Sequence, residues 1–96
     1  RTSSRIVPYL RNGSEMVRMT AVSSLSRLGG EEARRALTLA SQNDESGLVR
    51  SSALQELARR YPRAGTTHRA LQNAQNDPSP EVRSTAQALL SAEGSS

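Results

Sequence analysis

The chain has 96 residues, a length that suits a single domain. It contains no cysteine, which excludes disulfide bonds and thiolate metal sites. Apolar residues never run for more than three positions, so the sequence excludes a membrane-spanning segment. All 13 residues counted as Lys or Arg are Arg, and against 9 acids they give a net charge of +4. This surplus permits binding to acidic partners.

The apolar residues are mainly Ala and Leu, and Trp and Phe are absent. Alanine adds little buried area, so the sequence predicts a thin core for this length. A stacked repeat tolerates a thin core better than a globule does, because each unit packs only on its neighbours.

The first predicted element is a short helix over residues 4–10, in which Ile6, Val7 and Leu10 are apolar. Pro8 fits only the first turn of such a helix or a kink in it. The segment stands where a preceding repeat would have its second helix. Residues 1–12 are therefore interpreted as half a repeat.

A motif then occurs three times, in residues 12–25, 44–57 and 77–90. Each copy fits [N/D]-x-S-x-x-V-R-x-x-A-x-x-x-L without a gap, and the copies recur after 32 and 33 residues. Such a period indicates an array of small structural units. Apolar markers spaced by four, such as Val17, Ala21 and Leu25, form one stripe of an amphipathic helix, and the motif serine can cap its first turn. First helices are predicted near 14–28, 46–60 and 79–92.

Second helices are predicted between these copies. Gly29 and Gly30 indicate a helix stop and restart before a helix near 31–42, and Thr66 or Thr67 can cap a helix near 66–76. The last residues, 91–96, look like a frayed tail. The expected division is a half repeat over 1–12, repeats over 13–43 and 44–76, a first helix over 77–92 and a tail over 93–96.

These elements predict an all-α fold, a right-handed alpha-alpha superhelix, or solenoid, of antiparallel helix pairs with about six helices. Neither end resembles a polar capping repeat. We therefore expect a segment of a longer solenoid, with apolar helix faces at both ends of the stack through which the chain could self-associate.

The motif resembles the short HEAT-like repeat named after phycobilisome lyases, in which D-x-x-x-x-V-R opens the first helix. The matches are Asp44, Val49 and Arg50 in one copy and Asp77, Val82 and Arg83 in the next, whereas Asn12 replaces the aspartate of the first copy. The resemblance implies that the charged motif residues tie neighbouring repeats together through charge-assisted hydrogen bonds. This ladder comprises Asn12, Arg18, Asp44, Arg50, Asp77 and Arg83. Ligand binding by the same arginines is the alternative.

No catalytic pattern is visible, and we expect no enzyme activity, metal or cofactor. His68 is the only histidine and lies in a polar helix start, so we interpret it as a solvated surface residue. No serine stands in a G-x-S-x-G elbow. Nothing in the sequence identifies a compartment, although a soluble cytoplasmic protein is the expectation.

The charge surplus falls on the second helices. The first-helix segments hold seven arginines and seven acids, whereas the second-helix segments hold six arginines and two glutamates. The resemblance implies that second helices line a concave docking face. We expect a scaffold that binds a protein partner, with an acidic segment as the first choice, through arginines of that face, namely Arg5, Arg11, Arg34, Arg35 and Arg69. Sequence-independent binding to a nucleic-acid backbone is the alternative, and a pure structural spacer is a third possibility.

Overall fold

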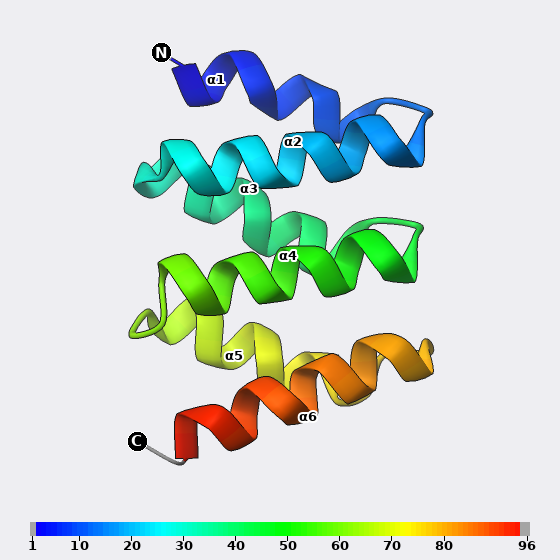
Figure 1. Cartoon of the computed structure of the whole chain (residues 1–96), viewed down its shortest axis with the longest axis vertical. Coiled ribbons are helices and arrows are strands. Elements are labelled where there is room, and N and C mark those ends of the chain that lie inside the picture. The colour runs from blue at the N-terminus through cyan, green and yellow to red at the C-terminus, as the bar shows by residue number, and fades with distance from the viewer. Residues whose placement is uncertain (1, 95–96) are drawn as a thin grey trace.

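The computed structural model describes residues 2–94, which form six α-helices, one 3-10 helix and no strand. The helices are α1 (Thr2–Ile6), η1 (Val7–Arg11), α2 (Glu15–Leu28), α3 (Gly30–Asn43), α4 (Gly47–Arg60), α5 (Gly65–Ala74) and α6 (Pro80–Gly94). They stack along the longest dimension of a body measuring 35 × 25 × 15 Å (Figure 1). The prediction of an all-α solenoid of antiparallel helix pairs is confirmed.

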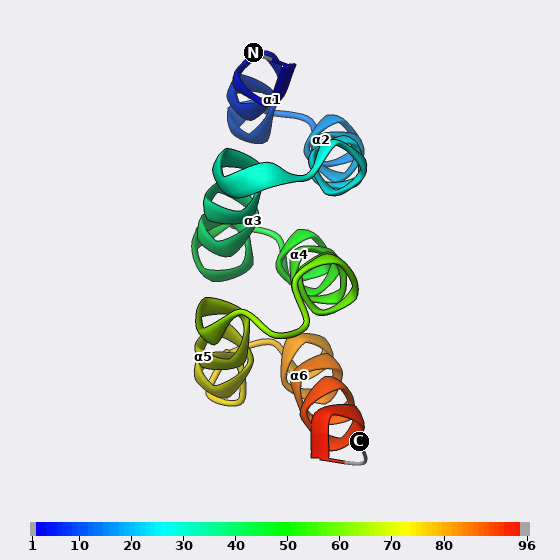
Figure 2. The same ribbon diagram turned by 90° about the vertical axis from the view of Figure 1, so that its left-hand side faces the viewer.

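The helices lie in two layers. Turned by 90°, the molecule shows α1, α3 and α5 in one column and α2, α4 and α6 in the other (Figure 2). Consecutive helices alternate between the columns, and within the second column α4 contacts both α2 and α6. The core fills the space between the columns. Its largest fully buried side chains are those of five leucines, Leu25, Leu37, Leu54, Leu57 and Leu71.

Local chemistry explains where the first helices begin. The side chains of Ser14 and Ser46 accept hydrogen bonds from the backbone N–H of Val17 and Val49, both at 3.3 Å. These bonds satisfy N–H groups that have no partner within the helix. Gly29 ends α2 at φ 72°, and Gly30 follows at φ 90°, so the predicted stop and restart is confirmed.

Three boundaries differ from the predictions. The first segment is α-helical only to Ile6. It continues as a 3-10 helix, because Pro8 has no N–H to continue the α-helix. Helix α5 begins at Gly65 after the uncapped Ala64, so neither predicted threonine caps it. Helix α6 continues to Gly94, so residues 91–94 belong to a helix rather than a frayed tail. Residues 95 and 96 lie outside the described part.

Candidate functional site

The junction between α2 and α4 is crossed by Arg18. Its Nε atom donates to Oδ2 of Asp44 at 3.0 Å, and its Nη1 atom donates to the backbone oxygen of Asn12 at 2.8 Å. Glu45 lies 3.6 Å from the same guanidinium. The arginine is buried, and it joins the start of one copy of the motif to the start of the next.

The junction between α4 and α6 repeats this arrangement with a fuller contact. Arg50 donates from Nε and Nη2 to the two carboxylate oxygens of Asp77, at 2.9 and 2.8 Å, and from Nη1 to the backbone oxygen of Asp44 at 2.6 Å. Only 11% of the Arg50 side chain and 10% of the Asp77 side chain are exposed. Arg83 reaches the backbone oxygens of Asp77 and Pro78, at 2.8 and 3.1 Å.

The side chain at the first motif position, held by Asn12, Asp44 and Asp77, also accepts a hydrogen bond within its own copy. In each copy the Oδ1 atom accepts a hydrogen bond from the backbone N–H two residues later, at 2.8, 2.9 and 2.9 Å. Asp44 receives Arg18 of the preceding copy on its other oxygen, whereas Asp77 receives Arg50 on both of its oxygens. Asn12 has an amide nitrogen in place of the second oxygen, so it cannot offer an arginine the two-oxygen contact that Asp77 makes.

The neighbours of the Asp77 carboxyl group shift its pKa. The hydrogen bond from Arg50 lowers the pKa of Asp77 below its ordinary value, against burial, which raises it. The backbone bond from Ser79 and the nearby charge of Arg83 lower it further. The ionised carboxylate is therefore the form that the folded protein favours.

The arginines expected on the docking face differ in whether other side chains of the fold already bind them. Arg5, Arg11, Arg35 and Arg69 are all exposed on the α1, α3 and α5 layer. Among residues 2–94, none forms a hydrogen bond or ion pair with the side chains of Arg5, Arg11 or Arg69, and Arg35 has only a 4.0 Å approach to Glu31. Arg1, which contributes to the charge surplus, lies outside the described residues.

Arg34 is held within the molecule. It pairs with Glu31 and donates from Nη1 to the hydroxyl of Thr66 on the next helix of its layer, which leaves 18% of its side chain exposed. The hydrogen bond with Glu31 raises the pKa of Arg34 and lowers the pKa of Glu31. The other glutamate of this turn, Glu32, accepts from the Ser4 hydroxyl at 2.8 and 3.0 Å. Both acids of this layer therefore have partners within the fold.

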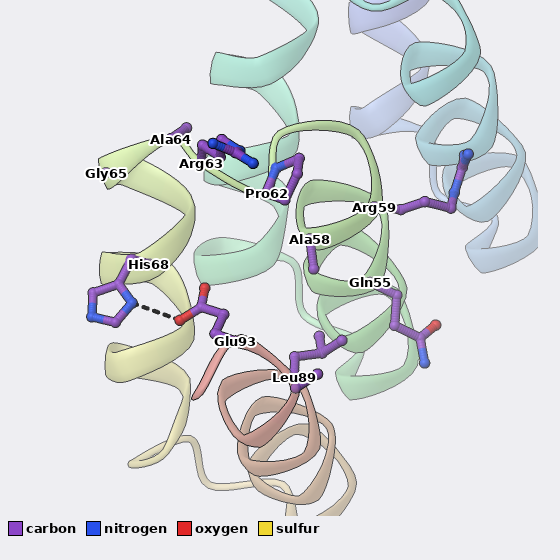
Figure 3. Close-up of a pocket in the computed structure, with 11 residues that line it drawn as sticks. Gln55, Ala58, Arg59, Pro62, Arg63, Ala64, Gly65, His68, Leu89 and Glu93 are labelled. Carbon is purple, nitrogen blue, oxygen red and sulfur yellow. Dashed lines mark hydrogen bonds and ion pairs between the residues drawn. The ribbon is translucent and has the colours of Figure 1, made fainter. Parts of the chain in front are cut away.

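His68 lines a pocket of about 730 Å³ at the turn between α4 and α5. Its Nδ1 atom lies 2.8 Å from Oε1 of Glu93, near the end of α6 (Figure 3). The histidine is exposed, as the sequence indicated, but it pairs with a residue that was assigned to the tail. Arg59 and Arg60 end α4, just before this turn. The corresponding positions of α6, one motif period later, hold the smaller residues Ala92 and Glu93.

Several contacts between repeats carried no recognisable signal in the sequence. The hydroxyl groups of Ser51 and Thr85 lie 2.7 Å apart between α4 and α6, and the Tyr61 hydroxyl donates to the backbone oxygen of Gly30 at 3.0 Å. Glu15 accepts from the Ser46 hydroxyl. Their separations of 31 to 34 residues match one repeat, but the period alone does not indicate which side chains meet.

Residues 2–94 bring no three metal-ligating side chains together, and no helix among them is long and apolar enough to cross a membrane. Stacked helix pairs with repeated interhelical arginine contacts define a helical repeat scaffold. The family model for HEAT repeats matches residues 1–58, and the chain belongs to the HEAT repeat family. Proteins of this family are generally interaction scaffolds and are typically not enzymes. No curated protein and no solved structure matches the chain.

Proposed function

We propose that the chain is a non-catalytic scaffold that binds an acidic protein segment through the layer of α1, η1, α3 and α5. The contacts on this layer are Arg5, Arg11, Arg35 and Arg69. The observation that carries the proposal is that these four exposed guanidinium groups lie in one layer, whose two glutamates are held mainly by Arg34 and by Ser4. Arg34 contributes less, since Glu31 and Thr66 already hold it.

An acidic peptide fits this layer better than a nucleic acid does. Arginine forms bidentate contacts with carboxylates, and exposed arginines one helix apart can meet successive acidic side chains. Single-stranded nucleic acid would require aromatic platforms for its bases, and Tyr9 and Tyr61 are the only aromatic residues of the chain. Binding to a duplex backbone through charge alone remains as an outcome of the test below.

We assign a purely structural role to the motif residues Asn12, Arg18, Asp44, Arg50, Asp77 and Arg83. Arg18 and Arg50 reach the aspartate of the next copy, and Arg83 reaches backbone oxygens of its own copy, which leaves few free donors for a ligand. We also propose that the repeats are of the short, phycobilisome-lyase type and divide at residues 12, 43 and 76. The recurrence after 32 and 33 residues, shorter than the usual HEAT period, supports that subtype.

The test uses two double variants of equal charge. Arg35→Gln with Arg69→Gln removes two contacts of the proposed face, and Arg27→Gln with Arg63→Gln removes two exposed arginines outside it. Binding of fluorescent octaglutamate is measured by anisotropy at two salt concentrations. Each exposed ion pair contributes roughly 0.2–1 kcal/mol, so loss of two pairs should make the first variant bind about twofold to thirtyfold more weakly, while the second binds as the parent does.

A second titration with a 20-base-pair DNA duplex separates the two ligand classes. The proposal requires the peptide to bind at a salt concentration at which the duplex no longer does, because duplex binding through phosphates weakens steeply with salt. Equal losses in the two variants would show that net charge, rather than this face, drives binding. Binding of the duplex alone would replace the proposal with the nucleic-acid alternative.

A further inference from the structure

A groove runs between η1 and α3, two neighbouring elements of the layer that carries the exposed arginines. It encloses about 350 Å³, which lies at the lower end of the range for ligand sites, roughly 300–1,000 Å³. Its apolar lining consists of Val7, Leu10, Ala36, Leu39 and Ala40. None of its lining residues comes from α2, which packs against both η1 and α3. The groove therefore opens on the outer side of the layer.

The groove lies within the stack rather than at one of its ends. Helix α3 contacts the α1–η1 segment on one side and α5 on the other, and these elements form one column (Figure 2). A further repeat before α1 would follow the same stacking and would pack against the opposite side of α1. Such a repeat would leave the space between η1 and α3 open, so the groove is a property of this face.

The apolar residues of the groove can seat one large side chain of a partner. Ala36 and Ala40 form its floor, each 8% exposed, and their small side chains leave room above them. Leu39 forms the rim on the α3 side and is 59% exposed, while half-buried aliphatic residues line the η1 side. In α5 the position of Leu39 is held by Asn73, so the corresponding row of α5 lacks this large apolar side chain.

The charges around the groove favour an acidic ligand. Arg11 lines one end of it, and Arg35 is exposed on α3 one helical turn before the rim leucine, on the same face of the helix. The carboxylate that lines the groove, that of Asp44, is 5% exposed and accepts from Arg18. The carboxylate of Glu45 lies 3.6 Å from the same guanidinium. Two exposed guanidinium groups therefore flank the apolar seat, and the nearest carboxylates face Arg18.

We propose that the groove receives one large apolar side chain of an acidic partner segment, with an acidic residue on either side of it. This inference rests on the proposed function of the same layer. Arg35 and Asn43 are eight positions apart on α3, about 12 Å along the helix, and Arg11 lines the groove together with Asn43. An extended peptide covers about 3.3 Å per residue. The two acids therefore stand about four positions apart, with the apolar residue between them.

Three fluorescent peptides test this preference by anisotropy at one low salt concentration. They are octaglutamate, octaglutamate with leucine at its fourth position, and octaglutamate with serine at that position. The leucine and serine peptides carry the same charge, so the difference between them reports the apolar side chain. Because an open groove buries only part of a leucine, the leucine peptide should bind about fivefold more tightly than the serine peptide.

Two matched variants of the 96-residue chain place the preference in the groove. Leu39→Gln removes the apolar rim and should reduce the preference for the leucine peptide to less than about twofold. Leu48→Gln changes an exposed leucine of α4, in the other layer, and should keep the preference of the parent. Both leucines are exposed, so neither substitution should unfold the chain.

The outcomes separate this inference from the proposed function. Equal affinities of the parent for the leucine and serine peptides overturn the inference, and so does an unchanged preference in Leu39→Gln. In either case, octaglutamate binding that depends on Arg35 and Arg69 leaves the proposed function standing. If the parent binds none of the three peptides, the proposed function fails, and the inference that rests on it fails as well.

Discussion

The contact between Arg50 and Asp77 offers the sharpest test of what holds the repeats together. The perturbation is a double-mutant cycle of Arg50→Ala, Asp77→Ala and the combined variant. Arg50→Ala removes two hydrogen bonds to the carboxylate and one to the backbone oxygen of Asp44. Asp77→Ala also removes the bond to the Ser79 backbone, and the cycle cancels that loss.

The expected magnitude follows from burial and hydrogen-bond count. Breaking a buried ion pair by removing one partner costs about 3–5 kcal/mol, and about a tenth of each side chain here remains exposed. We expect Arg50→Ala to lower the free energy of unfolding by about 3 kcal/mol, with a coupling energy of about 2 kcal/mol between the two residues. For a chain of this length the loss corresponds to a melting temperature lower by about 15 °C.

The assay is urea unfolding followed by circular dichroism at pH 7 and again at acid pH. The pKa of Asp77 is lowered in the folded protein, so its stabilisation is present above the unfolded value of about 3.9 and is lost as pH falls through the folded pKa. The difference between the parent and Arg50→Ala should therefore shrink below about pH 4. A coupling energy under about 0.5 kcal/mol, or a difference that does not change with pH, would refute the reasoning.

Two further predictions concern single sites. Thr67 is fully buried and its hydroxyl has no partner among the described residues, so Thr67→Val should raise the free energy of unfolding by about 1 kcal/mol, measured by urea unfolding; a destabilised variant would reveal an unrecognised partner. Gly29 has a φ of 72°, and a methyl group there would meet the Arg60 side chain. Gly29→Ala should therefore lower the melting temperature and cost about 2 kcal/mol, whereas Gly13→Ala, with open space around it, should be nearly neutral; equal effects at the two glycines would contradict the strain argument.

The sequence predicted the helices well where the local signal was repeated. The motif serines located the starts of the first helices within one residue, and the glycine pair located the turn after Leu28. The prediction failed where two signals competed. Thr67 looked like a helix cap but is buried inside α5, because it takes the inward position that Ala33 holds in α3. Helix α6 continues past residue 92, with Glu93 paired to His68 on α5.

The sequence by itself determined the solenoid, because the helix period, the capping residues and the 32–33 residue spacing can be recognised without knowing which side chains meet in space. Only the tertiary structure decided which charged side chains are free. Arg34 and Arg35 are adjacent in sequence, yet one is held by Glu31 and Thr66 while the other is exposed. That distinction depends on which face of a helix meets its neighbour, and the packing between layers sets that orientation.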